Sequence, residues 1–272
     1  MTASLSPDLA LARRIEAHEA WSASSHAFTQ SLRGDATLVG ALPVGEGHAV
    51  FCGSRSPNNA LYGWGLSASD FETEIDAAEA FYRARHAVCA VRLCPMAQPD
   101  ALRTLTTRGY GIRDFMNVYV RRPEPTADDH AEHGDITIRS AAPIEAREWF
   151  ARAGYAGPWA DPDGVEFMLI RSCFKPGSQL FLARQGDEVV GGGALEIMNG
   201  TAALMAAMTS PYSRGRGVHS LLVQARLRAA YEAGCDLALV HTRSGADSQR
   251  NVLRAGFQLA YTTVTVVAGG RS

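Results

Sequence analysis

The segment at residues 212–219, Tyr-Ser-Arg-Gly-Arg-Gly-Val-His, constrains the fold of this chain more than any other. It follows an apolar, strand-like run at residues 202–208 and opens an amphipathic helical pattern. Gly215 and Gly217, one on each side of Arg216, leave backbone N–H groups free and let a ligand approach closely. Because these groups lie at the positive end of a helix dipole, the segment predicts an anion site, and we expect a phosphorylated ligand there.

Composition narrows the class of protein. A hydrophobic content of 46% and a charged content of 20% are typical of a soluble globular chain with a core. The net charge of -2 gives no electrostatic reason to expect nucleic acid or an acidic membrane as a partner. No apolar run approaches the roughly 20 residues that span a bilayer, and the first residues lack the basic start and apolar block of a signal peptide. We expect a cytoplasmic protein.

The cysteines do not indicate a disulfide framework or a metal site. There are 5 of them, scattered and without a CxxC pair. An odd, unpaired set favours buried thiols in a reducing compartment.

The chain divides into two similar halves. Residues 121–134 are polar, contain two prolines and show no periodicity, which predicts a linker. Before it, residues 105–120 read as a helix end, a Gly-Tyr stop and a strand, and residues 252–266 repeat that order with Gly-Phe. A repeat of about 140 residues predicts two copies of one domain. We expect a first domain at residues 1–122, a linker at 123–134 and a second domain at 135–272.

The second half reads as antiparallel strands followed by alternating helices and strands, which is a mixed α/β fold. The expected strands are residues 179–184, 189–197, 202–209, 237–240 and 261–267. A helix follows Gly217 and ends at Gly234, and a second one spans residues 247–255 with Asp247 or Ser248 as its N-cap.

Two common glycine-rich phosphate motifs do not fit the segment. A P-loop requires a Lys-Ser or Lys-Thr pair, which does not follow Gly217. A dinucleotide fingerprint requires a third glycine where Ser220 stands, and an acid after the next strand, whereas Asp236 precedes that strand.

The order of four motifs resembles the GCN5-related N-acetyltransferases. Arg214-x-x-Gly217-x-His219 is similar to their R/Q-x-x-G-x-G/A loop. The glycines at 191–193, the Thr-Ser-Pro-Tyr run at 209–212 and the Ser-Gln-Arg-Asn run at 248–251, followed by Gly-Phe at 256–257, resemble the family's other blocks. The resemblance covers residues 136–267, about half of the chain. It implies a fold of mixed, mainly antiparallel sheets flanked by helices.

The resemblance also implies an acetyl-CoA-dependent N-acetyltransferase, with acetyl-CoA as acyl donor. An amine, expected to belong to a small molecule, would take the acetyl group directly in a ternary complex, without a metal. The residues implied to hold the cofactor are Ala207, Met208, Arg214, Gly215, Arg216, Gly217, Val218, His219, Ser248 and Asn251. Some of these have simpler interpretations, since the arginines and His219 can be surface residues, and Ser248 and Asn251 can cap a helix.

The catalytic assignments are less direct. Many family members carry a tyrosine four residues before the Gly-Phe pair, where Val252 stands here. The resemblance leaves three candidates for the acid, namely Tyr261, the Ser248 hydroxyl and solvent. Glu196 is the candidate general base, and its alternative is an exposed carboxylate at a strand end. Because of Val252, a non-catalytic acyl-CoA sensor stays open, as does transfer to a protein amine.

The remaining expectations concern the first half and the acceptor. Residues 58–65 and the Gly-Tyr pair at 109–110 resemble the family without its loop, which implies a degenerate domain that lacks its own acetyl-CoA site and shapes the acceptor pocket. The aromatic group Trp149, Phe150, Tyr155 and Trp159, with its neighbouring prolines, is either core or a wall of the acceptor site. An apolar stripe with helical spacing at residues 71–82 predicts core. We expect a monomer or a homodimer.

Overall fold

The computed structural model describes residues 5, 7–32, 38–54, 56–125, 132–152 and 174–269. The chain forms two compact units. Unit 1 comprises Met1–Val118, Thr242–Ser244 and Leu259–Ser272, and unit 2 comprises Tyr119–His241 and Gly245–Gln258.

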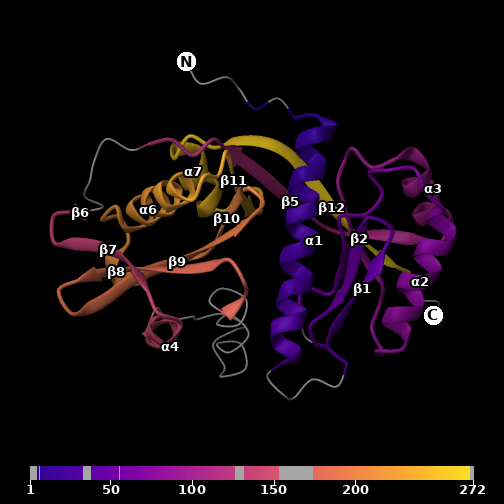
Figure 1. Cartoon of the computed structure of the whole chain (residues 1–272), viewed down its shortest axis with the longest axis horizontal. Coiled ribbons are helices and arrows are strands. Elements are labelled where there is room, and N and C mark those ends of the chain that lie inside the picture. Colours follow the sequence, from indigo (N-terminus) through magenta and orange to yellow (C-terminus); the bar gives the residue numbers. More distant parts are fainter. Residues whose placement is uncertain are drawn as a thin grey trace. The chain divides into compact units, whose positions relative to one another are not determined.

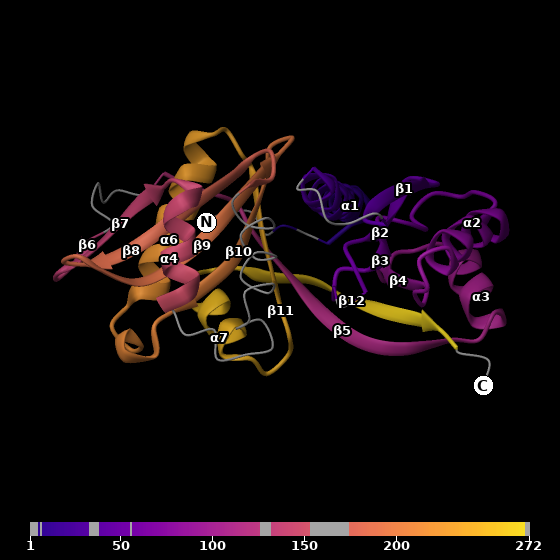
Figure 2. The same cartoon turned by 90° about the horizontal axis from the view of Figure 1, so that it is seen from below.

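Unit 1 is a mixed sheet with helices on it (Figures 1 and 2). Its elements are α1 (Leu9–Ser31), β1 (Gly40–Val44), β2 (Gly47–Phe51), β3 (Ala60–Tyr62), α2 (Phe71–Arg83), β4 (Ala90–Leu93), α3 (Pro99–Thr107), β5 (Tyr110–Arg121) and β12 (Gln258–Ala268). The strand order is β1-β2-β3-β4-β12-β5. The stripe predicted at residues 71–82 is confirmed as core, since its members on α2 are all buried, namely Phe71, Ile75, Ala78, Phe81 and Tyr82.

Unit 2 is a mainly antiparallel sheet (Figure 1). Its elements are β6 (Glu132–His133), β7 (Ile136–Ala141), α4 (Pro143–Arg152), β8 (Ser178–Gln185), β9 (Glu188–Met198), β10 (Thr201–Thr209), a short 3-10 turn η2 (Pro211–Ser213), α6 (Val218–Glu232), β11 (Leu237–Thr242) and α7 (Asp247–Arg254). The strand order is β11-β10-β9-β8-β7-β6, and only β11 runs parallel to its neighbour β10 among these described strands. The mixed α/β fold expected from the sequence is confirmed.

The three consecutive glycines of β9 let helices approach both faces of the unit 2 sheet. A Cβ on Gly191 would come within 2.8 Å of the Val218 side chain on α6, and one on Gly192 within 2.5 Å of the Trp149 ring on α4. Successive strand residues point to opposite faces, so this alternation seats α6 and α4 on opposite sides of β9. The glycines therefore serve close packing.

The predicted N-cap of the helix α7 is wrong, and the prediction for the cysteines can be checked for four of them. The N-cap of α7 is Ala246, without a side-chain hydrogen bond, so the prediction of Asp247 or Ser248 is wrong. The Gln249 Oε1 accepts from the Gly245 N–H at 2.6 Å, which holds the turn that leads into α7. Four of the cysteines are free and buried, as expected, and Cys173 lies outside the described residues.

Apart from the short turn η2, the described parts of residues 9–121 and 143–268 share one order of elements, a helix followed by three strands and then by helix, strand, helix and strand. The final strand of the sequence, β12, nevertheless pairs with β4 of unit 1, with Val264 opposite Leu93. Residues 259–272 thus belong to unit 1, and Tyr119 begins unit 2. The boundaries of the compact units therefore differ from those of the expected domains at 1–122 and 135–272. None of the helices among the described residues is long and apolar enough to span a bilayer.

Candidate functional site

The segment between β10 and α6 is built to leave backbone donors free. Gly215 and Gly217 have φ angles of +76° and +80°, which side-chain-bearing residues rarely adopt, so the turn requires glycine at both positions. Gly217 is the N-cap of α6 and offers no side chain to its first N–H groups. These N–H groups have no acceptor within the helix, and together with the helix dipole they favour an anion.

The two arginines of this segment have different surroundings. Arg216 binds the Gln185 side chain at 2.6 Å and Asp135 at 3.2 Å, which ties the segment to the end of β8 and the start of β7. Arg214 is exposed and forms no hydrogen bond or ion pair with the residues that the structure describes. Arg214 is thus the cation of the segment that is available to a phosphate.

Strand β10 parts from β11 next to this segment. The parallel pairing runs from Thr201 opposite Leu237 to Ala203 opposite Leu239, and no further pair forms along these two described strands. Against β9, the register of β10 shifts between Met205 and Met208. Strand β10 therefore contains a bulge at residues 206–207, next to Met208.

The bulge places polar backbone groups where they can be reached. Ala206 has a φ angle of +50° and lies outside the ladder with β9. Residues 201–204 are buried, whereas Ala207 is exposed and its neighbours are half-buried. Strand edges with unpaired N–H and C=O groups are sites where an extended ligand can add hydrogen bonds.

A buried arginine supports the bulge. Arg226 of α6 is 1% exposed and donates to three carbonyls, those of Leu222 at 2.8 Å, Ala194 at 3.2 Å and Met205 at 3.2 Å. Burial lowers the pKa of this guanidinium to about 10, so it remains charged at neutral pH. The carbonyl of Met205 lies at the start of the bulge, so this contact fixes the bulge to α6.

His219 occupies the first turn of α6 as a neutral imidazole. Burial and the positive charge of Arg226 lower its pKa to about 4. It is therefore uncharged under physiological conditions and adds no cation to the anion site. Val218 beside it is buried in the core.

Glu196, the predicted general base, is 0% exposed and forms an ion pair with Lys175, whose Nζ lies 2.5 Å from its Oε1. The alternative of an exposed carboxylate is therefore wrong. A buried pair of this kind is costly to open, because either partner would be left as an uncompensated charge. The catalytic role of Glu196 stays a prediction and requires this pair to separate.

Tyr261, the predicted acid, lies in unit 1. Its hydroxyl donates to Glu16 Oε1 of α1 at 2.9 Å, and burial together with the Glu16 charge raises the pKa of the phenol. The segment at 214–219 belongs to unit 2. The catalytic role of Tyr261 likewise stays a prediction.

The remaining predicted residues lie on α7 in unit 2. Ser248 is exposed and Asn251 is half-buried, so both hydroxyl and amide can be reached by a ligand. Val252, which stands where the family often has tyrosine, is buried in the core. Trp149 is also core, whereas the side chain of Phe150 and residues Tyr155 and Trp159 lie outside what the structure describes.

Unit 1 has a corresponding loop between β3 and α2, and its own acids occupy it. The Glu46 carboxylate accepts the N–H groups of Leu66 and Ser67, both at 2.7 Å, and the Ser67 hydroxyl at 2.8 Å. Asp70 caps α2 by accepting from the Thr73 N–H at 3.2 Å. A phosphate would meet negative charge at this loop and no free donors in these positions.

Sequence patterns missed three of these features. Arg226 interrupts the apolar face of α6, four residues after Leu222. A charged residue on such a face is a sequence signal that could have predicted a buried, hydrogen-bonded arginine. The pairing of Glu196 with Lys175 and the blocking of the unit 1 loop by Glu46 have no local signal.

Residues 143–257 match the model of the acetyltransferase (GNAT) family. A search of curated protein sequences gave no match. A GCN5-related N-acetyltransferase from Kribbella flavida aligns with a TM-score of 0.65 at 18% identity, over 91% of this chain and 96% of that one. Another from Sphaerobacter thermophilus aligns with a TM-score of 0.57 at 16% identity, over 76% of this chain and 71% of that one.

A third solved structure is a tandem GNAT protein from the clavulanic acid biosynthesis pathway. It aligns with a TM-score of 0.56 at 14% identity, over 74% of this chain and 70% of that one. At these identities the likeness concerns the fold. The segment at 143–257 thus matches the acetyltransferase (GNAT) family, and the chain has the fold of GCN5-related N-acetyltransferases.

Proposed function

We propose that this protein transfers an acetyl group from acetyl-CoA to an amine, and that unit 2 holds the donor. The observation that carries the proposal is the segment at 214–219, where two left-handed glycines leave the N–H groups at the start of α6 uncapped. The pyrophosphate would accept from the N–H groups of Gly217, Val218 and His219, with Arg214 as its counter-ion.

The pantetheine arm would follow the edge of β10 that β11 leaves unpaired beyond Ala203. Its amides could then complete the backbone hydrogen bonds of that edge, as an added strand does. Ser248 and Asn251 of α7 are the side chains proposed to contact this arm. The thioester carbonyl would accept from a backbone N–H at Ala207 or Met208, in the bulge that Arg226 fixes.

Direct transfer requires a neutral amine that attacks the thioester carbon. The C–N bond forms and the C–S bond breaks through a tetrahedral intermediate, in which the attacking nitrogen loses one proton to solvent and the thiolate takes up one. An alkyl amine is mostly protonated at neutral pH, because its pKa is about 10. Glu196, reached through water after it leaves Lys175, is the proposed acceptor of that proton, while solvent or Tyr261 would protonate the thiolate.

We further propose that the chain contains two GNAT-like copies and that unit 1 has lost its donor site. The shared order of elements supports the duplication. Glu46 and Asp70 support the loss, since their carboxylates occupy the loop that corresponds to the segment at 214–219.

A second function, binding of acyl-CoA without chemistry, is favoured by the surroundings of the proposed catalytic groups. Val252 is core, the Tyr261 hydroxyl binds Glu16, and Glu196 is paired with Lys175. A regulatory module needs the donor site and none of these groups.

The two functions are separated by measuring binding and turnover on the same preparation. Acetyl-CoA and desulfo-CoA should raise the melting temperature, whereas NAD and ATP should not. With acetyl-CoA and a panel of small amines, an enzyme releases free thiol in step with amide formation. Binding without thiol release would establish the sensor, and the absence of any shift with either CoA compound would refute both.

A further inference from the structure

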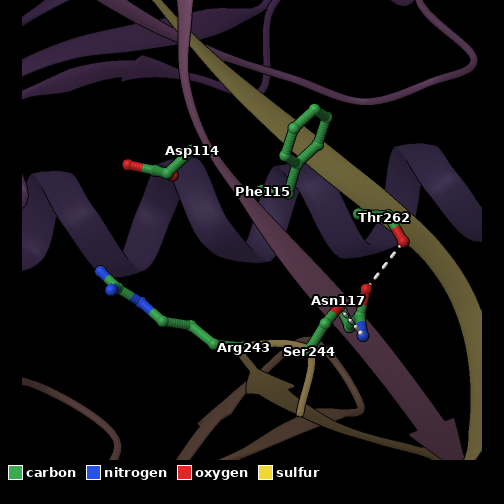
Figure 3. A pocket seen from close by; sticks show the side chains of 6 residues that line it. All are labelled: Asp114, Phe115, Asn117, Arg243, Ser244 and Thr262. Atoms are coloured by element: carbon green, nitrogen blue, oxygen red, sulfur yellow. Dashed lines mark hydrogen bonds between the residues drawn. The ribbon is translucent and has the colours of Figure 1, made fainter. Parts of the chain in front are cut away.

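Unit 1 contains an open hollow of about 420 Å³, which lies within the volumes usual for small-molecule sites (Figure 3). It is formed by β5, β12 and the residues that follow β11. The lining residues are Asp114, Phe115, Asn117, Arg243, Ser244 and Thr262.

One wall of the hollow is a chain of hydrogen bonds. The Thr262 hydroxyl donates to Asn117 Oδ1 at 2.8 Å, and Asn117 Nδ2 donates to the Ser244 hydroxyl oxygen at 3.0 Å (Figure 3). Asn117 is 6% exposed, so these bonds hold a buried amide in a fixed orientation. Because the Ser244 oxygen accepts from Asn117, its own O–H remains to be donated into the hollow.

The negative charge of Asp114, another lining residue, is balanced by neighbouring residues. Its two oxygens accept from Arg113 Nε at 3.0 Å and from the Thr265 hydroxyl at 2.9 Å. Although burial opposes the effect, these bonds lower the pKa of the carboxyl, with a smaller contribution from the charge of Arg243. The carboxylate is therefore ionised and neutralised chiefly by Arg113.

Arg243 is the unbalanced charge of the hollow. Its guanidinium is exposed and makes no hydrogen bond or ion pair within the described part of the chain. A guanidinium presents paired N–H donors in a planar fork that matches a carboxylate. The free capacity of the hollow is thus a fork of donors and one hydroxyl donor, and its lining also includes the aromatic ring of Phe115.

We propose that this hollow binds the carboxylate of a small organic acid. The two carboxylate oxygens would accept from the Arg243 guanidinium, and one of them also from the Ser244 hydroxyl. The apolar part of the acid would lie against Phe115, whose side chain is 56% exposed. This site is additional to the acyl-CoA site and does not depend on it.

The test is calorimetric titration of the full-length protein, without CoA, with three probes that share one apolar part. These are 3-phenylpropanoate, 3-phenylpropanol and 2-phenylethylamine. We expect saturable binding of the carboxylate alone. Equal binding of the alcohol or the amine would overturn the proposal, as would the absence of any carboxylate binding.

Variants locate the site. Arg243→Gln should weaken binding of 3-phenylpropanoate by about tenfold to a hundredfold, the usual worth of hydrogen bonds to a charged group. Arg243→Lys keeps the charge but not the fork and should give an intermediate loss. Arg254→Gln, which changes another exposed arginine without a described partner, should bind like the wild type.

The same variants separate this site from the proposed donor site. Acetyl-CoA should raise the melting temperature of Arg243→Gln as much as that of the wild type. Unchanged 3-phenylpropanoate binding by Arg243→Gln would place the carboxylate elsewhere and refute the assignment.

Discussion

A buried carboxylate in α1 gives the most quantitative prediction for this protein. Glu16 is 3% exposed and accepts a hydrogen bond from Tyr261 at 2.9 Å. Burial raises the pKa of Glu16 from 4.5 to about 7, opposed by the charge of Arg92 and reinforced by that of Glu19. Folding therefore favours the protonated form of this side chain.

The direction of the pH dependence follows from that difference. The folded chain binds a proton at Glu16 that the unfolded chain has released, so the contribution of Glu16 to stability is most favourable below about pH 4.5 and is lost as the pH rises through about 7. A tenfold change in an ionisation constant is worth about 1.4 kcal/mol, so a move from 4.5 to about 7 is worth about 3 kcal/mol.

The substitution Glu16→Gln removes this titration while its amide oxygen can still accept from Tyr261. Relative to the wild type, the variant should gain up to about 3 kcal/mol between about pH 5 and pH 8. Urea unfolding of both proteins across this range measures the difference, with the exposed Glu188→Gln as control. Parallel stability curves for the wild type and Glu16→Gln would refute the reasoning.

Two further substitutions test unit 2. Gly192→Ala would place a Cβ 2.5 Å from the Trp149 ring, and overpacking of this kind costs about 1–3 kcal/mol, so calorimetry should show a lower melting temperature. Gly111→Ala, which meets nothing within 4 Å, should leave it unchanged. Arg226→Met keeps an unbranched apolar stem but removes the bonds to the carbonyls, including that of Met205, and should lower kcat by about tenfold or more with little change in acetyl-CoA affinity. Full kcat in Arg226→Met would show that the bulge does not need this contact.

Local signals predicted most of the unit 2 elements. The order of strands and helices could be predicted from residue 178 onward, because hydrophobic periodicity and glycine stops act over a few positions. The turn at Gly215 and Gly217 could be predicted for the same reason, since the left-handed backbone is a property of the turn itself.

Features that depend on distant contacts could not be predicted. Tyr261 meets Glu16 across 245 positions of sequence, because β12 pairs with β4. Arg226 reaches the Met205 carbonyl only because Gly193 leaves room for its guanidinium. Hydrophobic periodicity along the sequence carries no signal of such pairings.

The central claim is that the segment at 214–219 holds the pyrophosphate of an acyl-CoA, and calorimetric titration with CoA and with pantetheine tests it most directly. The claim predicts that CoA binds the wild type at least about tenfold more tightly than pantetheine, which lacks the pyrophosphate and the adenosine phosphate attached to it. Gly217→Val should remove that preference, whereas Gly234→Val, at a left-handed glycine beyond the other end of α6, should keep it. Equal affinity of the wild type for CoA and pantetheine, or unchanged CoA binding by Gly217→Val, would contradict the claim.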